Sequence, residues 1–142
     1  MSTYQLANLI RARFPMIYIT TFEEDRVTKY ISSIVTDENK VKYKREVYTW
    51  TQTNGFYNET LLKKIPDTDS PCKALDYIKR ADKDSVFIMY DFHINFGPKN
   101  RTPDYNVIRK IRDIIPDLKL GTVRKTVFFI SPELLIPESL QK

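Results

Sequence analysis

A chain of 142 residues is long enough to bury roughly 70% of the surface of its unfolded form, so we expect one domain, residues 1–142, that needs no structural metal or disulfide bond. The single cysteine, Cys72, excludes an internal disulfide, no apolar run approaches the roughly 20 residues that span a bilayer, and no charged and then apolar leader opens the chain. These features favour a soluble cytoplasmic protein without membrane partners. The excess of basic side chains is uneven: residues 98–142 carry nine basic and five acidic side chains, whereas residues 1–97 carry 14 basic and 13 acidic ones.

The first part of the chain predicts two helices around a short strand. Apolar residues at helical spacing predict an amphipathic helix over residues 2–14, which Pro15 ends. The apolar run 16–20 then predicts a buried strand. A second amphipathic helix is expected over residues 21–37, with acidic side chains in its first turn.

The middle of the chain contains one clear strand and one stretch without a period. Residues 46–52 alternate and are rich in β-branched and aromatic side chains, which predicts a strand. Residues 56–69 show no clear period, so we expect a loop with one helical turn near residues 61–62. The next helix begins at Ser70, a good cap, with Pro71 at the first helical position.

The last part predicts two strands around a helix. The stretch 85–93 contains five apolar or aromatic residues in a row, too few for a helix and typical of a strand buried on both faces, and then turns polar. A loop is expected over residues 95–103, followed by a helix from Asp104 that Pro116 should kink or restart. Residues 125–131 predict the fourth strand.

This alternation of helices and strands predicts the fold class. Helix and strand alternate four times, and three of the four strands are nearly all apolar. Such an order implies right-handed crossovers and a parallel sheet covered by helices on both faces. We therefore expect an α/β three-layer domain with a mostly parallel sheet.

Asp91 and His93 follow the strand at residues 85–90 and are the first candidates for chemistry. Ligands of open parallel α/β sheets bind at the carboxyl ends of the strands, where both residues lie. In an extended chain a spacing of two puts both side chains on one side, which would permit an acid–base couple. However, no Ser or Cys is placed as its nucleophile, and one histidine excludes a multi-histidine metal centre, so a structural role is the alternative and no metal is expected.

The order of these segments resembles a phosphate-binding-loop (P-loop) NTPase fold of the additional-strand, RecA/AAA-like type. More narrowly, the chain is similar to the N-terminal region of AAA-family ATPases of the chloroplast and cyanobacterial hypothetical reading-frame type. The matching stretches cover nearly the whole chain: residues 9–19, 21–27, 48–50, 74–78, 86–93, 108–113 and 125–130.

This resemblance implies a non-catalytic domain. In that family the region precedes a separate ATPase module, and the present chain has no Gly-x-x-x-x-Gly-Lys-Ser/Thr motif and only three glycines. The resemblance therefore implies a degenerate P-loop fold that lacks Walker A. No cofactor and no ATPase activity are expected from these residues, and ATP and magnesium are implied only for a downstream ATPase module.

The position equivalent to the phosphate loop contains Thr20, Thr21, Glu23, Glu24 and Asp25. A working loop presents backbone N–H groups, a lysine and a helix N-terminus to an anion. Here three carboxylates surround the helix start, so a triphosphate would meet like charge. Stabilisation of the helix dipole is a sufficient structural role for these acids.

The strand that ends at Asp91 resembles a Walker B strand, so Asp91 and His93 are Walker B-like by position. In an ATPase such an aspartate helps to hold Mg²⁺, and the next residue is commonly a glutamate, whereas here it is Phe92. The structural alternative is that the Asp91 carboxylate accepts hydrogen bonds from the loop backbone or from Thr20 or Thr21.

A nucleic-acid interface is the runner-up, through the basic side chains of the C-terminal third, with Arg109, Lys110 and Arg112 as candidate contacts. A solvated helix face explains the same charges. Aromatic residues of the second strand and its loop could stack on bases, pack in the core, or form a partner surface if that strand lies at a sheet edge. They are Tyr48, Trp50, Phe56 and Tyr57.

The function implied by the resemblance is that of an assembly, regulatory or partner-recruiting N-terminal domain of a AAA-type ATPase. The expected partners are its own ATPase module, other proteins or further copies of the chain, with nucleic acid as the alternative.

Overall fold

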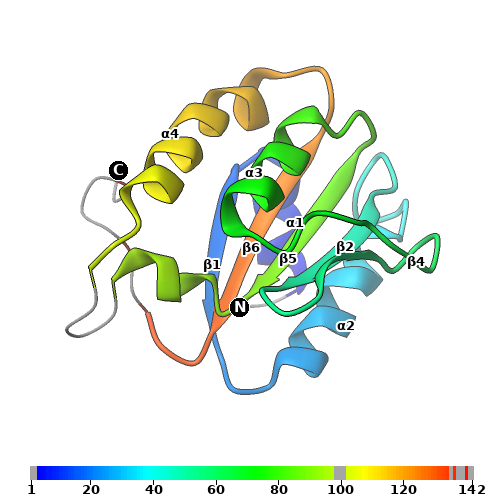
Figure 1. The fold of residues 1–142 in the computed structure, drawn as a ribbon. Helices are drawn as coiled ribbons and strands as arrows, with labels where there is room; N and C mark the ends of the chain where they lie inside the picture. Colours follow the sequence, from blue (N-terminus) through cyan, green and yellow to red (C-terminus); the bar gives the residue numbers. More distant parts are fainter. Residues whose placement is uncertain (1–2, 98–101, 135, 137–139, 141–142) are drawn as a thin grey trace.

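A computed structural model describes residues 3–97, 102–134, 136 and 140, and these form one six-stranded sheet covered by helices (Figure 1). The strands are β1 (Met16–Thr20), β2 (Glu46–Thr51), β3 (Gly55–Asn58), β4 (Lys63–Lys64), β5 (Ser85–Tyr90) and β6 (Lys125–Ser131). The helices are α1 (Thr3–Arg11), α2 (Glu24–Val35), α3 (Pro71–Arg80), the 3₁₀ helix η1 (Phe92–Phe96) and α4 (Tyr105–Leu120).

The strand order is β1-β6-β5-β2-β3-β4, and β1, β6, β5 and β2 are parallel. β6 is thus inserted between β1 and β5. β3 and β4 extend the sheet beyond β2 as antiparallel strands. The prediction of an α/β domain with a mostly parallel sheet is therefore confirmed.

The sheet separates two apolar layers, because side chains alternate between the faces of each strand. On β5, Phe87 and Met89 pack in the layer under α3 and α4, whereas Val86 and Ile88 pack in the layer under α1 and α2. Figure 1 shows α3 and α4 in front of the sheet and α1 and α2 behind it. β5 is buried on both faces, as its sequence predicts.

The prediction for residues 56–69 is wrong, because two short strands occupy part of this stretch. Gly55, at φ +72°, turns the chain so that β3 pairs back on β2. Asn58 then ends β3, and its side-chain oxygen accepts the backbone N–H groups of Thr60 and Leu61. A tight turn with Leu62 at φ +56° therefore replaces the expected helical turn, since that backbone region is not helical.

Several helix boundaries also differ from expectation. α2 begins at Glu24, because the side chain of Thr21 accepts the backbone N–H of Glu23 and holds residues 21–23 in a turn. η1 occupies the start of the stretch expected to be a loop. α4 continues through Pro116 to its end without a restart. The proline removes only the hydrogen bond to the carbonyl of Arg112, which lies on an exposed turn of the helix.

Lys125 at the start of β6 is a buried cation that joins the sheet to α3. Its Nζ donates to the carbonyl oxygens of Ile78 at 2.8 Å, Lys79 at 3.1 Å and Ala81 at 3.0 Å. These carbonyls lie at the C-terminal end of α3, where no helical N–H remains to pair with them. Burial lowers the pKa of Lys125, yet the three acceptors match its three donors.

We expect Lys125→Met to lower the free energy of unfolding by about 1–3 kcal/mol, because the buried carbonyls of α3 would lose their donor. Urea denaturation measures this change. Lys79→Met is the matched control, since Lys79 is an exposed lysine on the same helix end and its replacement should cost less than about 0.5 kcal/mol. Equal losses in the two variants would contradict the role given to Lys125.

Candidate functional site

The carboxyl ends of the parallel strands meet along one edge of the sheet, which we call the carboxyl edge. The backbone N–H of Thr21, after β1, donates to the carbonyl of Ser131 at the end of β6. The backbone N–H of Asp91, after β5, donates to the carbonyl of Ile130. The segments that follow β1, β6 and β5 are therefore held side by side, at the edge where open parallel sheets bind ligands.

The turn between β1 and α2 carries acids and an exposed aromatic ring. Glu23, Glu24 and Asp25 surround the start of α2, and Glu23 forms an exposed ion pair with Arg26 at 3.2 Å. Phe22 is 88% exposed. The turn contains no glycine and no lysine, so it lacks the groups with which a phosphate loop binds its anion.

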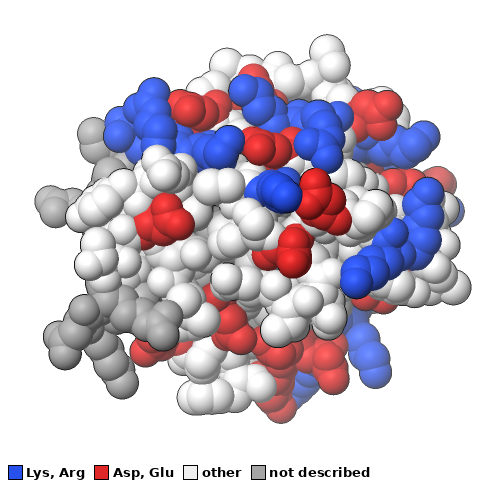
Figure 2. All heavy atoms as spheres, viewed as in Figure 1, with Lys and Arg blue, Asp and Glu red and all other residues white. Residues whose placement is uncertain are grey.

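The structure brings the acidic turn and Asp91 together. Burial raises the pKa of Glu24, and the carboxylates of Asp91 and Asp25 raise it further. These carboxylates therefore lie close enough to repel one another. Figure 2 shows acidic residues gathered at the end of the molecule where β1 and β6 finish, opposite an end rich in Lys and Arg.

Asp91 does not make the hydrogen bonds expected of it. It adopts the left-handed conformation at φ +56° and lies exposed. Across the described parts of the chain, its carboxylate has no hydrogen bond to the loop backbone, Thr20 or Thr21, and no ion pair. The expectation that this side chain secures the loop is wrong, because the backbone N–H of Asp91 fastens the strand end to β6 instead.

Among the described residues, His93 has no hydrogen bond or ion pair with Asp91, so the couple that the spacing would permit does not form. The strand ends at Tyr90, and the chain then turns into η1, which removes the extended spacing that would align the two side chains. His93 is buried, with Nε2 at 3.3 Å from the Glu133 carboxylate, while its buried Nδ1 has no hydrogen-bond partner among the described residues. Glu133 was not predicted as a partner, because it follows β6, 40 residues further along the chain.

Other features bear on catalysis and membranes. In the part of the chain that the structure describes, no three His, Cys, Asp or Glu side chains are grouped so as to hold a metal ion. Burial raises the pKa of the Cys72 thiol, which disfavours the reactive thiolate. Within the same residues, no helix has the length and apolar character needed to cross a bilayer.

The basic residues of α4 are partly neutralised. Arg109 pairs with Asp113 at 3.0 Å, and Lys110 pairs with Asp76 of α3 at 2.7 Å. Arg112 is exposed and has no ion pair with any described residue. Two of the three predicted contacts thus already have carboxylate partners.

The aromatic residues around β2 belong mainly to the core. Tyr48, Trp50 and Phe56 are buried, and Tyr57 is half-buried. The rings of Tyr48, Trp50 and Phe56 pack in the layer under α3 and α4, so these rings cannot stack on bases. β2 lies between β5 and β3, so the hypothesis that it forms a sheet edge is wrong.

Exposed apolar side chains at the carboxyl edge were missed by sequence reasoning. Phe22 follows β1, Ile94 follows β5 and Leu134 follows β6, and all three are exposed. The three strands are neighbours, so these side chains lie along one edge. The signal in the sequence was a large apolar residue two to four positions after each strand end, with an acidic residue in the same segment: Glu23, Asp91 and Glu133.

Comparison with known proteins gives the family. The sequence profile described as SpoVK-like AAA ATPase, N-terminal domain, matches residues 2–142. The chain is 32% identical over 140 residues to an uncharacterized AAA domain-containing protein, ycf46, of Trieres chinensis, covering 96% of the chain and 25% of that protein. Its identity to the ycf46 protein of Guillardia theta is 30% over 139 residues, covering 93% of the chain and 24% of that protein.

A third relative, the ycf46 protein of Pyropia yezoensis, is 28% identical over 140 residues, which cover 97% of the chain and 26% of that protein. The chain therefore spans about a quarter of the length of these relatives. No solved structure matches it significantly. With a family profile matched over almost its whole length, the chain belongs to the SpoVK-like AAA ATPase N-terminal domains.

Proposed function

We propose that this domain is non-catalytic and recruits a protein partner to a AAA ATPase through the carboxyl edge of its sheet. The observation that carries the proposal is the turn between β1 and α2, where carboxylates and an exposed Phe22 stand in place of a phosphate loop. The ATP and Mg²⁺ of the longer protein would bind in its ATPase module, outside residues 1–142.

Electrostatics argue against a nucleotide at this edge. Glu24 already has a raised pKa because of burial and of the neighbouring Asp91 and Asp25. Adding a triphosphate would place further negative charge beside these carboxylates in a partly buried place. The α2 N-terminus offers its free N–H groups, but its own acids already complement the dipole there.

The same edge has the composition of a docking surface. Large exposed apolar side chains surrounded by polar groups mark interaction sites on proteins. Here Phe22, Ile94 and Leu134 are accompanied by carboxylates after each strand end. Charge complementarity favours a basic amphipathic segment of a partner protein, with apolar side chains against the rings and lysines or arginines against the acids.

The first test concerns nucleotide binding. We expect ATP with Mg²⁺ to leave the backbone amide NMR signals of Thr20, Thr21 and Glu24 in place, because these residues form no phosphate site. Inorganic tripolyphosphate serves as the control, since an effect that it reproduces is not nucleotide recognition. Saturable shifts at these three amides with ATP alone would overturn the non-catalytic proposal.

The second test concerns docking. The probe is a synthetic amphipathic helix of about 18 residues built from leucine and lysine, and its twin carries glutamate in place of lysine. We expect the lysine peptide to bind, more weakly as salt is added, and the glutamate twin not to bind. Fluorescence anisotropy measures both affinities.

Phe22→Ser should weaken binding of the lysine peptide about tenfold or more, because a buried phenyl ring contributes roughly 1.5–3 kcal/mol. Leu120→Ser is the matched control, since Leu120 is 84% exposed but lies at the far end of α4. Equal affinity for the two peptides, or equal losses in the two variants, would refute docking at the carboxyl edge.

Nucleic-acid binding through α4 is the competing function, and no specific contact favours it, since Arg109 and Lys110 already pair with carboxylates. We expect the joint replacement of Arg109, Lys110 and Arg112 with glutamine to have no effect on gel retardation. The assay uses single-stranded and duplex oligonucleotides at low salt. Salt-sensitive retardation that this triple variant loses would support the competing function instead.

A further inference from the structure

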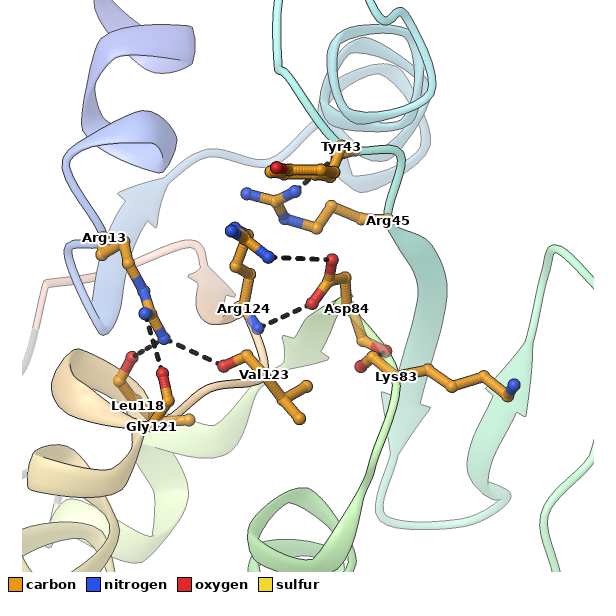
Figure 3. A network of polar contacts seen from close by, with 10 residues as sticks. Arg13, Tyr43, Arg45, Lys83, Asp84, Leu118, Gly121, Val123 and Arg124 are labelled. Carbon is orange, nitrogen blue, oxygen red and sulfur yellow. Dashed lines mark hydrogen bonds and ion pairs between the residues drawn. The ribbon is translucent and has the colours of Figure 1, made fainter.

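Three arginines gather at the opposite edge of the sheet, where the parallel strands begin, and we call Arg13, Arg45 and Arg124 the arginine cluster (Figure 3). Arg13 follows α1, Arg45 precedes β2 and Arg124 precedes β6. Figure 3 shows Arg45 and Arg124 beside Tyr43, and Arg13 nearby with its side chain directed to the carbonyls of Leu118, Gly121 and Val123. None of these residues takes part in the carboxyl edge.

Arg13 is fixed in place by neutral groups. Its guanidinium donates to the carbonyl oxygens of Gly121 at 2.8 Å, Leu118 at 3.1 Å and Val123 at 2.9 Å. Its Nε is buried and has no hydrogen-bond partner in the part of the chain that the structure describes. Carbonyl dipoles orient the group, but no carboxylate among the described residues neutralises its charge.

Arg45 is the most buried member of the cluster. Its side chain donates from Nη1 to the carbonyl of Tyr43 at 2.5 Å, and only 6% of the residue is exposed. Its Nε, like that of Arg13, is buried without a partner. Burial lowers the pKa of Arg45, and the charges of Arg124 and Arg13 lower it further, against the opposing effect of Asp84.

Arg124 faces solvent and shares the one carboxylate of the cluster. Its backbone N–H donates to Asp84 at 2.8 Å, and its guanidinium lies 3.6 Å from the same side chain. The guanidinium carbon is 3.9 Å from the centre of the Tyr43 ring, and Lys42 approaches that ring at 5.5 Å. The cluster thus contains three guanidinium groups and, in the described regions, a single carboxylate partner.

We propose that the arginine cluster binds a phosphate group. Two positive charges are left over in a partly buried place, two buried Nε–H donors have no acceptor among the described residues, and the side chain of Arg124 is 36% exposed. Guanidinium groups form paired charge-assisted hydrogen bonds with phosphate and carboxylate oxygens. A phosphate group carries a charge of about −1.5 to −2 at neutral pH, which matches the excess better than a single carboxylate does.

The ligand could be free inorganic phosphate or the phosphate of a phosphorylated small molecule, and the test separates these sources. Residues 1–142 are titrated with inorganic phosphate, free phosphoserine and acetate, each against sodium chloride at equal ionic strength. NMR follows the Nε–H signals of Arg13 and Arg45, and thermal unfolding follows stability.

We expect inorganic phosphate to shift both Nε–H signals saturably and to raise the melting temperature by several degrees well above its dissociation constant. Acetate should bind about tenfold more weakly, because it carries one charge and fewer acceptor oxygens. Equal binding of phosphoserine would assign the site to phosphate monoesters, and binding of inorganic phosphate alone would assign it to the free ion. Both results support a phosphate site.

Arg124→Gln should abolish the phosphate-dependent shift of the Nε–H signals. Arg112→Gln is the matched control, because Arg112 is an exposed arginine without an ion pair among the described residues, and it should keep the full response. Each variant is compared with itself in chloride, so a general loss of stability does not enter. No response beyond chloride, equal responses to acetate and phosphate, or an unchanged response in Arg124→Gln would overturn the proposal.

Discussion

The amino edge of this sheet is the edge where the parallel strands begin. It depends on one constraint: the last carbonyl groups of the helices that precede these strands need hydrogen-bond donors. α3 and α4 end just before β5 and β6, so the carbonyls that their last turns leave unpaired come together there. Two cations satisfy them: Lys125 donates three hydrogen bonds at the end of α3, and Arg13 donates to Leu118 and Gly121 at the end of α4. Each cation is also stabilised by the negative, C-terminal end of a helix dipole. Basic residues at this edge are therefore partly structural, and the polarity of the strands sets where they lie.

The opposite edge follows the same rule with the signs reversed. α2 begins directly after β1, and its unpaired N–H groups favour the carboxylates of Glu23, Glu24 and Asp25. A phosphate loop uses the same N–H groups to bind its ligand, so acids at this position and a bound triphosphate exclude each other. The acidic residues gathered at one end of the molecule in Figure 2 thus lie at the edge where the parallel strands finish.

The sequence predicts the layers of this fold well because they depend on local pattern. β1, β5 and β6 are continuous apolar runs, and each is found at the expected residues. β3 and β4 were missed because strands of four and two residues contain too few positions to show a period. The separation of Asp91 and His93 depends on one residue at positive φ, which no pattern predicts. Arg13 donates to acceptors 105 to 110 residues away in the chain, and Lys125 donates to acceptors 44 to 47 residues away. Their roles therefore depend on the packed fold rather than on neighbours in the chain.

The turn between β1 and α2 could change its function without disturbing the rest of the domain. Its hydrogen bonds are local to the edge and to the start of α2. The N–H of Thr21 donates to Ser131, the N–H of Glu23 to the Thr21 side chain, and the N–H of Val27 and the Arg26 side chain donate to Glu23. Phe22 contributes nothing to either apolar layer, since most of its surface is exposed. The layers on both faces of β5 are complete without it. The core and the strand order of this domain therefore do not depend on Phe22 or on the acids beside it.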